Sequence, residues 1–403
     1  MVPDSQQGAS HNWGIAKING RYWLMNPQGE RMYVLGLNHI YSVDEADQRT
    51  AIHHLESWGF NSAGYGAPPT VMAAYPGFIS LRLHDAPHWL PANRFRYEDV
   101  FSVSFEAKVK EIIRQKCEQG KGNDQVMGYS LTDTPRYDLD LSRKRRGMDW
   151  VSFIRSQGAD AAGKQRYVDF LRTTYQDQFE EFQQAYRLER LTSFEELLDY
   201  DFQYLELTRP AVRRDDEAFL AIIAEKLYQL TRTYFEEFHP GALLLSEKFK
   251  MHDHPEAILR LAGKYFDIIS IQPGPTIGPD AGQGPDESEF DPAYWQQLHA
   301  LTQKPILITD HGFSFFSQEY PRTLWHQFAS EAEAAAFYET YLTEVIQQPF
   351  IIGYLKCQYQ SQYDPLRSLL KQGLLDPEGM PYSLLVQEVS RINRLVLNRV
   401  YQK

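Results

Sequence analysis

Polar side chains recur along this chain at the ends of short apolar segments. The segment PILIT leads into Asp310 and His311, and the segment VMGYSL leads to Asp133 and Thr134. The other positions of this kind are Asn38, His39, Asn61, Tyr65, His84, Asp85, Glu247, Lys248, Gln272, Gln358 and Tyr359. Carboxylates and imidazoles transfer protons, and amides and hydroxyls bind polar substrates. If the segment ends meet in space, they form a polar pocket suited to a polyhydroxylated ligand.

The segments themselves predict the fold. Short β-rich runs alternate with helical patterns, which is typical of a parallel sheet built from βα units. Near-continuous apolar runs fit strands that are buried on both faces. The predicted strands are residues 33–40, 62–66, 79–84, 126–131, 242–246, 267–271, 305–309 and 350–355. Eight such units indicate the α/β class and a (β/α)8 TIM barrel, whose active site lies where the strands end.

Two features depart from an even barrel. The stretch INGRYWLMNPQGERMYVLG alternates apolar and polar residues around a turn, which predicts a β-hairpin before the first barrel strand. Residues 142–241 are too many for one loop between strands four and five, and they predict a helical insertion. No linker or repeat divides the chain, so we expect a single domain over residues 1–403.

Composition excludes several classes of protein. The net charge is -12 with 53 acidic side chains, which disfavours a nucleic-acid partner because phosphate binding needs Lys and Arg. No apolar run reaches the roughly 18 residues that a membrane span needs. The first residues, MVPDSQQGASHN, lack the basic start and apolar stretch of a signal peptide. We therefore expect a cytoplasmic protein with no membrane partner, and secretion of a trimmed mature chain is the alternative that stays open.

The sequence predicts no metal and no cofactor. Two cysteines, Cys117 and Cys357, are too few for a disulfide framework or a thiolate metal site. The run His252-Asp253-His254 has alternating potential ligands, but this pattern alone is weak and a solvent-exposed loop is the simpler interpretation. A dinucleotide is disfavoured because no G-x-G-x-x-G follows the first strand. No G-x-S-x-G of a serine hydrolase is present either.

The order of the motifs resembles family 50 agarases and related clan A glycoside hydrolases. The resemblance begins with NGRYWLMNPQGERMYVLGLNHI and continues through WGFN, GYSLTD, KQRYVDFLRTTY, HPGALLLSEKF, DIISI, KPILITDHGF and LLDPEGMPY. It extends over nearly the whole chain. The family implies an oligosaccharide substrate with β-linkages, and a galactose-containing one follows only from this resemblance.

The resemblance also implies which residues carry the chemistry. Strand seven of these enzymes supplies a glutamate nucleophile, and strand four supplies an Asn-Glu pair whose glutamate is the acid/base. By position, Asp310 stands for the nucleophile, Asp133 for the asparagine and Thr134 for the acid/base. Aspartate is one methylene shorter than glutamate, and a threonine hydroxyl cannot be a general acid near neutral pH. His311, next to Asp310, could hold that carboxylate ionised.

Three interpretations stay open at this point. In the first, the protein is a glycosidase with a rearranged carboxylate pair, Asp310 with Asp133 or Glu247, and the shorter side chains admit a water and favour inversion. In the second, the catalytic residues have decayed and the cleft binds carbohydrate without cleaving it. In the third, the strand-end histidines His39, His84 and His311 perform acid/base or metal chemistry. The residues expected to bind substrate are Asn38, His39, Tyr65, His84, Thr134, Glu247, Gln272, His311, Gln358 and Tyr359.

Overall fold

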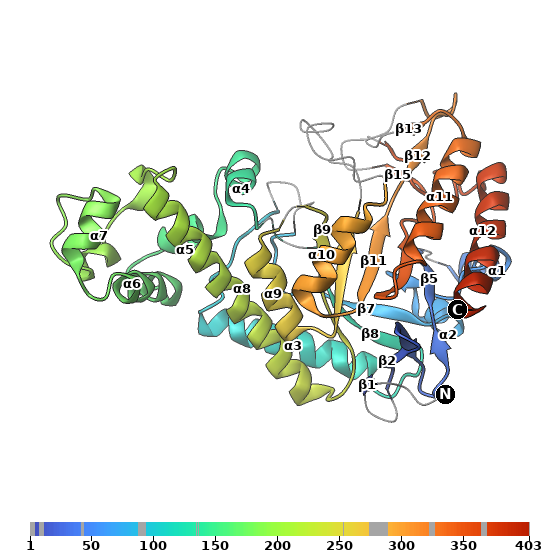
Figure 1. The fold of residues 1–403 in the computed structure, drawn as a ribbon, viewed down its shortest axis with the longest axis horizontal. Helices are drawn as coiled ribbons and strands as arrows, with labels where there is room; N and C mark the ends of the chain where they lie inside the picture. Colours follow the sequence, from blue (N-terminus) through green and yellow to red (C-terminus); the bar gives the residue numbers. More distant parts are fainter. Residues whose placement is uncertain are drawn as a thin grey trace.

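Eight parallel strands form the centre of the molecule (Figure 1). The computed structural model describes the chain apart from residues 1–4, 8–11, 42–43, 88–93, 134, 136, 253, 274–288, 322–326, 364–368 and 403. The strands are β5 (Val34–Leu37), β6 (Gly64–Tyr65), β7 (Gly77–Leu81), β8 (Val126–Leu131), β9 (Leu244–Lys250), β10 (Ile268–Gln272), β11 (Ile306–His311) and β14 (Ile351–Lys356). Each overlaps one of the predicted segments, with ends that differ by up to four residues, and the predicted TIM-barrel architecture is confirmed.

The barrel closes between its first and second strands. The sheet order is β5-β14-β11-β10-β9-β8-β7-β6, and a parallel bridge from Gly36 to Ser62 joins β5 to the segment before β6. The two segments approach closely here, since a Cβ atom on Gly36 would lie 3.1 Å from Ser62 Oγ. Glycine at this position leaves room for the close approach.

Helices surround the strands on the outside of the barrel (Figure 1). Between the strands lie α1 (Glu45–Ser57), α2 (Pro69–Ala74), α3 (Val103–Gly120), α9 (Glu256–Tyr265), α10 (Pro292–Thr302) and α11 (Glu331–Val345), and α12 (Ser383–Gln402) follows the last strand. Two short pairs, β12 (Ser314–Phe315) with β13 (Gln327–Phe328) and β15 (Gln362–Tyr363) with β16 (Leu369–Leu370), lie beyond the ends of β11 and β14. No helix in the described part of the chain is long and apolar enough to span a membrane.

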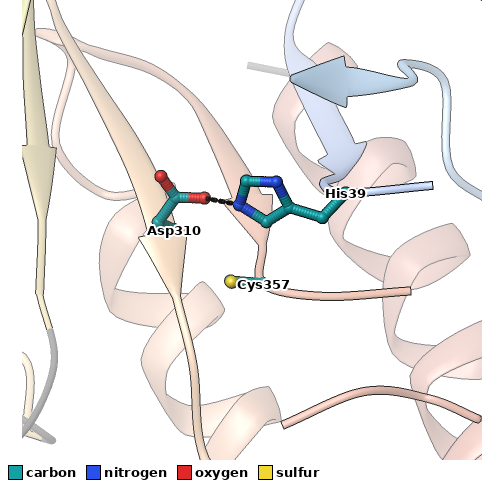
Figure 2. Close-up of side chains that lie close together, drawn as sticks. All are labelled: His39, Asp310 and Cys357. Atoms are coloured by element: carbon teal, nitrogen blue, oxygen red, sulfur yellow. Dashed lines mark hydrogen bonds and ion pairs between the residues drawn. The ribbon is translucent and has the colours of Figure 1, made fainter. Parts of the chain in front are cut away.

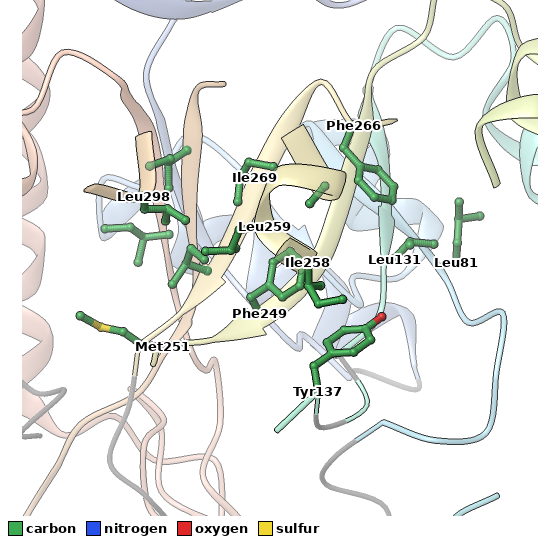
Figure 3. Close-up of a cluster of buried hydrophobic side chains, with 14 of the residues drawn as sticks. Leu81, Leu131, Tyr137, Phe249, Met251, Ile258, Leu259, Phe266, Ile269 and Leu298 are labelled. Carbon is green, nitrogen blue, oxygen red and sulfur yellow. The ribbon is translucent and has the colours of Figure 1, made fainter. Parts of the chain in front are cut away.

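Apolar side chains fill the layer between the strands and the helices. Figure 3 shows Phe249 and Ile269 from the strands beside Ile258 and Leu259 of α9. These side chains are all buried. The strands and helices are therefore bound together by burial of apolar surface, which is the main favourable contribution to folding.

The predicted hairpin before the first barrel strand is present, as part of a small antiparallel sheet. Its strands are β1 (Ser5–Gln7), β2 (Gly14–Ile18), β3 (Arg21–Met25) and β4 (Arg31–Met32). Trp13, Ile15 and Leu24 pack into the barrel interior in one cluster with residues from the barrel strands. Arg21 donates hydrogen bonds to the carbonyls of Ile346 and Gln348, just before β14 begins. The sheet therefore closes the barrel at the end where the strands start.

Helices occupy the long connection from β8 to β9. They are α4 (Leu139–Arg146), α5 (Trp150–Arg155), α6 (Ala162–Thr174), α7 (Phe179–Tyr186) and α8 (Pro210–Phe238), with short 3-10 turns at Glu195–Leu198 and Phe202–Tyr204. In Figure 1, α5, α6 and α7 project to one side, and α8 runs back to the barrel, where it packs on α3 and α9. The assignment of residues 142–241 as an insertion within one domain stays a prediction.

The small antiparallel sheet that closes the start of the barrel, which we call the hairpin plug, gives a first prediction on stability. Leu24 is fully buried, so Leu24→Ala removes apolar contacts and leaves a cavity at the closed end of the barrel. We expect the free energy of unfolding to fall by about 2–5 kcal/mol, measured by urea denaturation. The control is Leu384→Ala, since the Leu384 side chain is 45% exposed. Equal effects of the two substitutions would contradict the role of the hairpin as a plug.

Candidate functional site

Asp310 lies at the centre of the polar cluster at the ends of the strands. Its Oδ1 accepts hydrogen bonds from Asn38 Nδ2 at 2.5 Å and is 3.0 Å from His39 Nε2. Its Oδ2 accepts from Lys248 Nζ, also at 2.5 Å. Both carboxylate oxygens are thus held by side chains from two other strands, β5 and β9.

A local irregularity of β11 places Asp310 there. The register with β14 shifts between Ile308 and His311, because β11 carries one extra residue in this interval. Asp310 has a φ of 50°, in the left-handed region that aspartate tolerates better than most residues. The bulge re-aims the carboxylate towards the barrel axis while β11 continues to pair with β14.

The end of β5 supplies Asn38 and His39. The Asn38 side chain is fixed from behind, because its Oδ1 accepts the backbone N–H of Tyr65 at 3.0 Å. A Cβ atom on Gly64 would lie 2.1 Å from that same oxygen, so glycine makes room for the amide. His39 Nδ1 is 2.6 Å from the Tyr41 hydroxyl, and this contact orients the ring so that Nε2 faces Asp310.

Lys248 joins the two candidate carboxylates. Its ammonium is 2.5 Å from Asp310 Oδ2 and 4.0 Å from Asp133 Oδ2, and it lies 4.8 Å from the centre of the Tyr65 ring. Burial by itself would lower the pKa of Lys248, but the charges of Asp133 and Asp310 outweigh burial and raise it well above its ordinary value. The ammonium is therefore a permanent charge and cannot serve as a general acid near neutral pH.

Asp310 is held ionised by the same contacts. Burial alone would raise the pKa of Asp310, but the positive charge of Lys248 and the interactions with His39 lower it far below the ordinary value. His311 was expected to do this because it is next in sequence. In the structure its Nδ1 is instead 3.0 Å from the Tyr354 hydroxyl and its ring packs on Tyr341. Lys248 and His39 take the place of His311, since His311 faces the opposite side of β11.

Asp133 faces the other side of Lys248. Its Oδ1 accepts a hydrogen bond from Gln272 Nε2 at 2.8 Å, and Gln272 also donates to the carbonyl of Lys248. The Asp133 side chain is 14% exposed, which is more than the exposed fraction of the Asp310 side chain. The structure therefore brings together Asn38, His39, Tyr65, Asp133, Gln272 and Asp310 around one lysine. Their roles in catalysis and substrate binding stay predictions.

Glu247 and His84 form a separate buried cluster. Glu247 has no exposed surface, and it accepts hydrogen bonds from Tyr137 at 2.8 Å and Tyr228 at 2.9 Å. His84 Nδ1 accepts the backbone N–H of Ala86, so its Nε2 carries the proton that points to Glu247 at 3.3 Å. Burial and the charge of Glu247 raise the pKa values of Tyr137 and Tyr228 well above the usual value of a tyrosine. These contacts tie the helical segment after β8 to the barrel wall.

The remaining predicted positions lie at the edge of the cluster or outside the described residues. Tyr359 turns outward to α1, where its hydroxyl is 2.9 Å from His54 Nδ1. Gln358 is buried, and its backbone N–H donates to the carbonyl of Gln372. Thr134, the residue at the acid/base position, lies outside the residues that the structure describes. The substrate-binding roles of all three stay predictions.

Two residues to which the sequence assigned no role belong to this cluster. Lys248 points to the barrel axis because β9 has one extra residue between its pairings at Leu245 and Lys248. That bulge also turns Glu247 outward. Cys357, which follows β14, offers its sulfur beside His39 and Asp310 (Figure 2). The sequence places Lys248 among the polar residues at the segment ends, but no pattern marks the bulge in β9 that turns it to the barrel axis.

Comparison with known proteins finds solved structures of the same fold. No protein-family model matches the sequence, and no curated protein matches it. Among solved structures, an agarase superposes with a TM-score of 0.78 at 16% identity, covering 98% of this chain and 66% of that chain. An exo-β-agarase gives 0.79 at 17% identity with the same coverage. A β-galactosidase from Marinomonas ef1 gives 0.61 at 11% identity, covering 92% of this chain and 60% of the other.

These likenesses confirm the predicted resemblance to agarases at the level of the fold. The chain spans about two thirds of the length of the two agarases named above. At such low sequence identities, these likenesses indicate the fold and do not identify a substrate or a reaction. The chemistry of the site therefore depends on the residues that this chain places there.

A buried lysine next to the site gives a pH-dependent prediction. Lys356 has no exposed surface, and it donates to the carbonyls of Cys357 and Gln372 at 2.7 and 2.6 Å. Burial lowers its pKa from 10.5 to about 7. The unfolded chain therefore binds one proton more than the folded chain between about pH 7 and 10.5, and the free energy of unfolding that this group contributes rises with pH across that window.

The measurement is urea denaturation of the wild type and of Lys356→Met from pH 6 to pH 10. We expect the stability of the wild type relative to the variant to rise as pH increases through this range. Lys121→Met is the control, because Lys121 is exposed. A difference between the wild type and Lys356→Met that does not change with pH would contradict the lowered pKa.

Proposed function

We propose that this protein binds and hydrolyses a β-linked oligosaccharide at the end of the barrel where Asp310 and Asp133 face Lys248. The observation that carries the proposal is the pair of carboxylates on either side of one ammonium. A glycosidase needs two carboxyl groups flanking the bond that breaks. The agarase and β-galactosidase folds that the chain resembles support a galactose-containing substrate.

The two carboxylates take different roles. Asp310 is kept ionised by Lys248 and His39, so it is suited to attack the anomeric carbon. Asp133 lies on the other side of the ammonium, and in this proposal it takes the role of the acid/base that exchanges a proton with the leaving oxygen. Water then cleaves the glycosyl-aspartate bond and restores Asp310, while Asp133 takes the proton of that water.

Direct attack by Asp310 on the anomeric carbon implies retention of configuration. The other expectation, that the shorter aspartates widen the gap, admit a water and favour inversion, stays a prediction. The anomeric configuration of the first product, measured by proton NMR, distinguishes the two.

A second candidate function is carbohydrate binding without cleavage. This function is favoured by the hydrogen bonds of Asp310. Both of its carboxylate oxygens already bind side chains of the protein, namely Asn38, His39 and Lys248. An aspartate in this state needs to give up a hydrogen bond before it can attack a sugar. The two functions share the binding site and differ in turnover alone.

Substitution of Asp310 separates the two functions. Asp310→Asn keeps the shape and removes the charge, so we expect turnover of agarose-derived oligosaccharides or aryl β-galactosides to fall by at least about 10³-fold. Binding of the oligosaccharide, measured by calorimetry, should survive. Asp85→Asn is the matched control, because Asp85 also follows a barrel strand and is half-exposed beside Arg82.

Two outcomes would overturn the hydrolytic assignment. If the wild type binds these sugars and releases no product, the second candidate function holds. If Asp310→Asn retains full turnover, Asp310 is not the reacting carboxylate.

Substitution of Lys248 tests whether its charge keeps Asp310 ionised. Lys248→Gln removes the charge that lowers the pKa of Asp310, so that pKa should rise. Because the ionised carboxylate is the reactive form, activity should be lost at a higher pH on the acidic side of the profile of kcat against pH. The control is Lys264→Gln, which removes an exposed ion pair between Lys264 of α9 and Glu225 of α8. An unchanged acidic limb would show that another group controls it.

A further inference from the structure

Three different metal-binding side chains meet beside the candidate nucleophile. His39, Asp310 and Cys357 each offer one ligand atom, and these atoms lie within 4.8 Å of one another. The three residues come from the ends of β5, β11 and β14, which are adjacent in the barrel. Figure 2 shows the sulfur of Cys357 next to the linked pair of His39 and Asp310. Among the described residues, this is the one group with such geometry.

The ligand set indicates the metal. An imidazole nitrogen, a carboxylate oxygen and a thiolate are the donors that Zn²⁺ binds, at about 2.0–2.3 Å. Ligand atoms of a tetrahedral zinc ion are roughly 3.3–3.7 Å apart by the same geometry. The three side chains therefore need to close by about 1 Å around the ion. Three protein ligands leave a fourth position for water.

The charges around the cluster favour a divalent ion. Asp133 and Asp310 carry two negative charges and Lys248 carries one positive charge, so the group has a net negative charge before a metal binds. A Zn²⁺ ion that replaces the thiol proton of Cys357 makes the group neutral, which reduces the cost of burying these charges together. Lys248 binds Oδ2 of Asp310, so Oδ1 can turn to the metal without breaking that ion pair.

Neighbouring side chains support each ligand. The Tyr41 hydroxyl contacts His39 Nδ1 at 2.6 Å, so its oxygen can accept a hydrogen bond from Nδ1–H when Nε2 binds a metal. Gln372 Nε2 donates to Cys357 Sγ at 3.3 Å, which fixes the position of the sulfur. Such outer contacts fix the orientation of metal ligands and raise the affinity of a site.

We propose that His39, Asp310 and Cys357 bind one Zn²⁺ ion, and that the bound ion inhibits the protein by occupying Asp310 Oδ1. Binding exchanges the thiol proton for the metal: the S–H bond breaks, a Zn–S bond forms and the proton leaves to solvent, with no change of oxidation state. The inhibitory effect rests on the proposed hydrolytic function, whereas the binding itself does not.

Cobalt provides a direct test of binding. Co²⁺ is titrated into the full-length protein after chelator treatment, and absorption in the near-ultraviolet reports a Co–thiolate bond. We expect one equivalent to bind and Zn²⁺ to displace it. Cys357→Ser should abolish the band, and Cys117→Ser should leave it unchanged, because Cys117 is buried on α3 away from this cluster. His39→Gln should weaken Zn²⁺ binding by about tenfold or more, with circular dichroism to verify folding.

The outcomes distinguish binding from regulation. A wild type with no Co–thiolate band at millimolar Co²⁺, or a Cys357→Ser variant with the same band, would overturn the zinc site. If the site binds metal and the wild type turns over sugar, Zn²⁺ should lower the turnover of the wild type and of Cys117→Ser. The turnover of Cys357→Ser should be the same with and without Zn²⁺. Equal inhibition of all three would overturn the regulatory role. Metal binding without any sugar turnover would refute the hydrolytic function and leave the zinc site standing.

Discussion

One ion pair determines how the end of this barrel is organised. The Lys248 ammonium lies between Asp310 and Asp133 in a region with little exposure to solvent. Without it, two carboxylates would share a poorly solvated space, and their repulsion would force one of them to take up a proton. With it, Asp310 stays ionised and both side chains keep fixed positions. The hydrogen bonds from Asn38 and His39 to Asp310 depend on the same charge.

The bulge in β9 gives this lysine its position and links it to the helices after β8. Alternation along an unbroken strand would send Glu247 inward and Lys248 outward. The extra residue reverses the two. Lys248 then reaches the carboxylates, and Glu247 reaches Tyr137 and Tyr228. Tyr228 of α8 is thus hydrogen-bonded to the residue that precedes the central lysine in sequence.

The sequence was sufficient for the fold because the fold depends on repeated patterns. Eight apolar runs separated by helices predicted the barrel, and alternation around a turn predicted the hairpin, since both patterns report which faces are buried. The site depends on single residues that break those patterns. Two bulges and two left-handed residues, His39 and Asp310, place its side chains. Periodicity contains no information on such features, so His311 was favoured over Lys248 as the partner of Asp310.

The short side chain at position 310 and the lysine at position 248 belong together. A glutamate at 310 would carry its carboxylate one methylene farther towards Asp133, into the space that the Lys248 ammonium fills. Aspartate leaves that space, and the ammonium occupies it at 2.5 Å from Oδ2. In this protein the Lys248 ammonium lies beside the shorter side chain of Asp310. The two residues therefore fill this space together from different strands, β9 and β11.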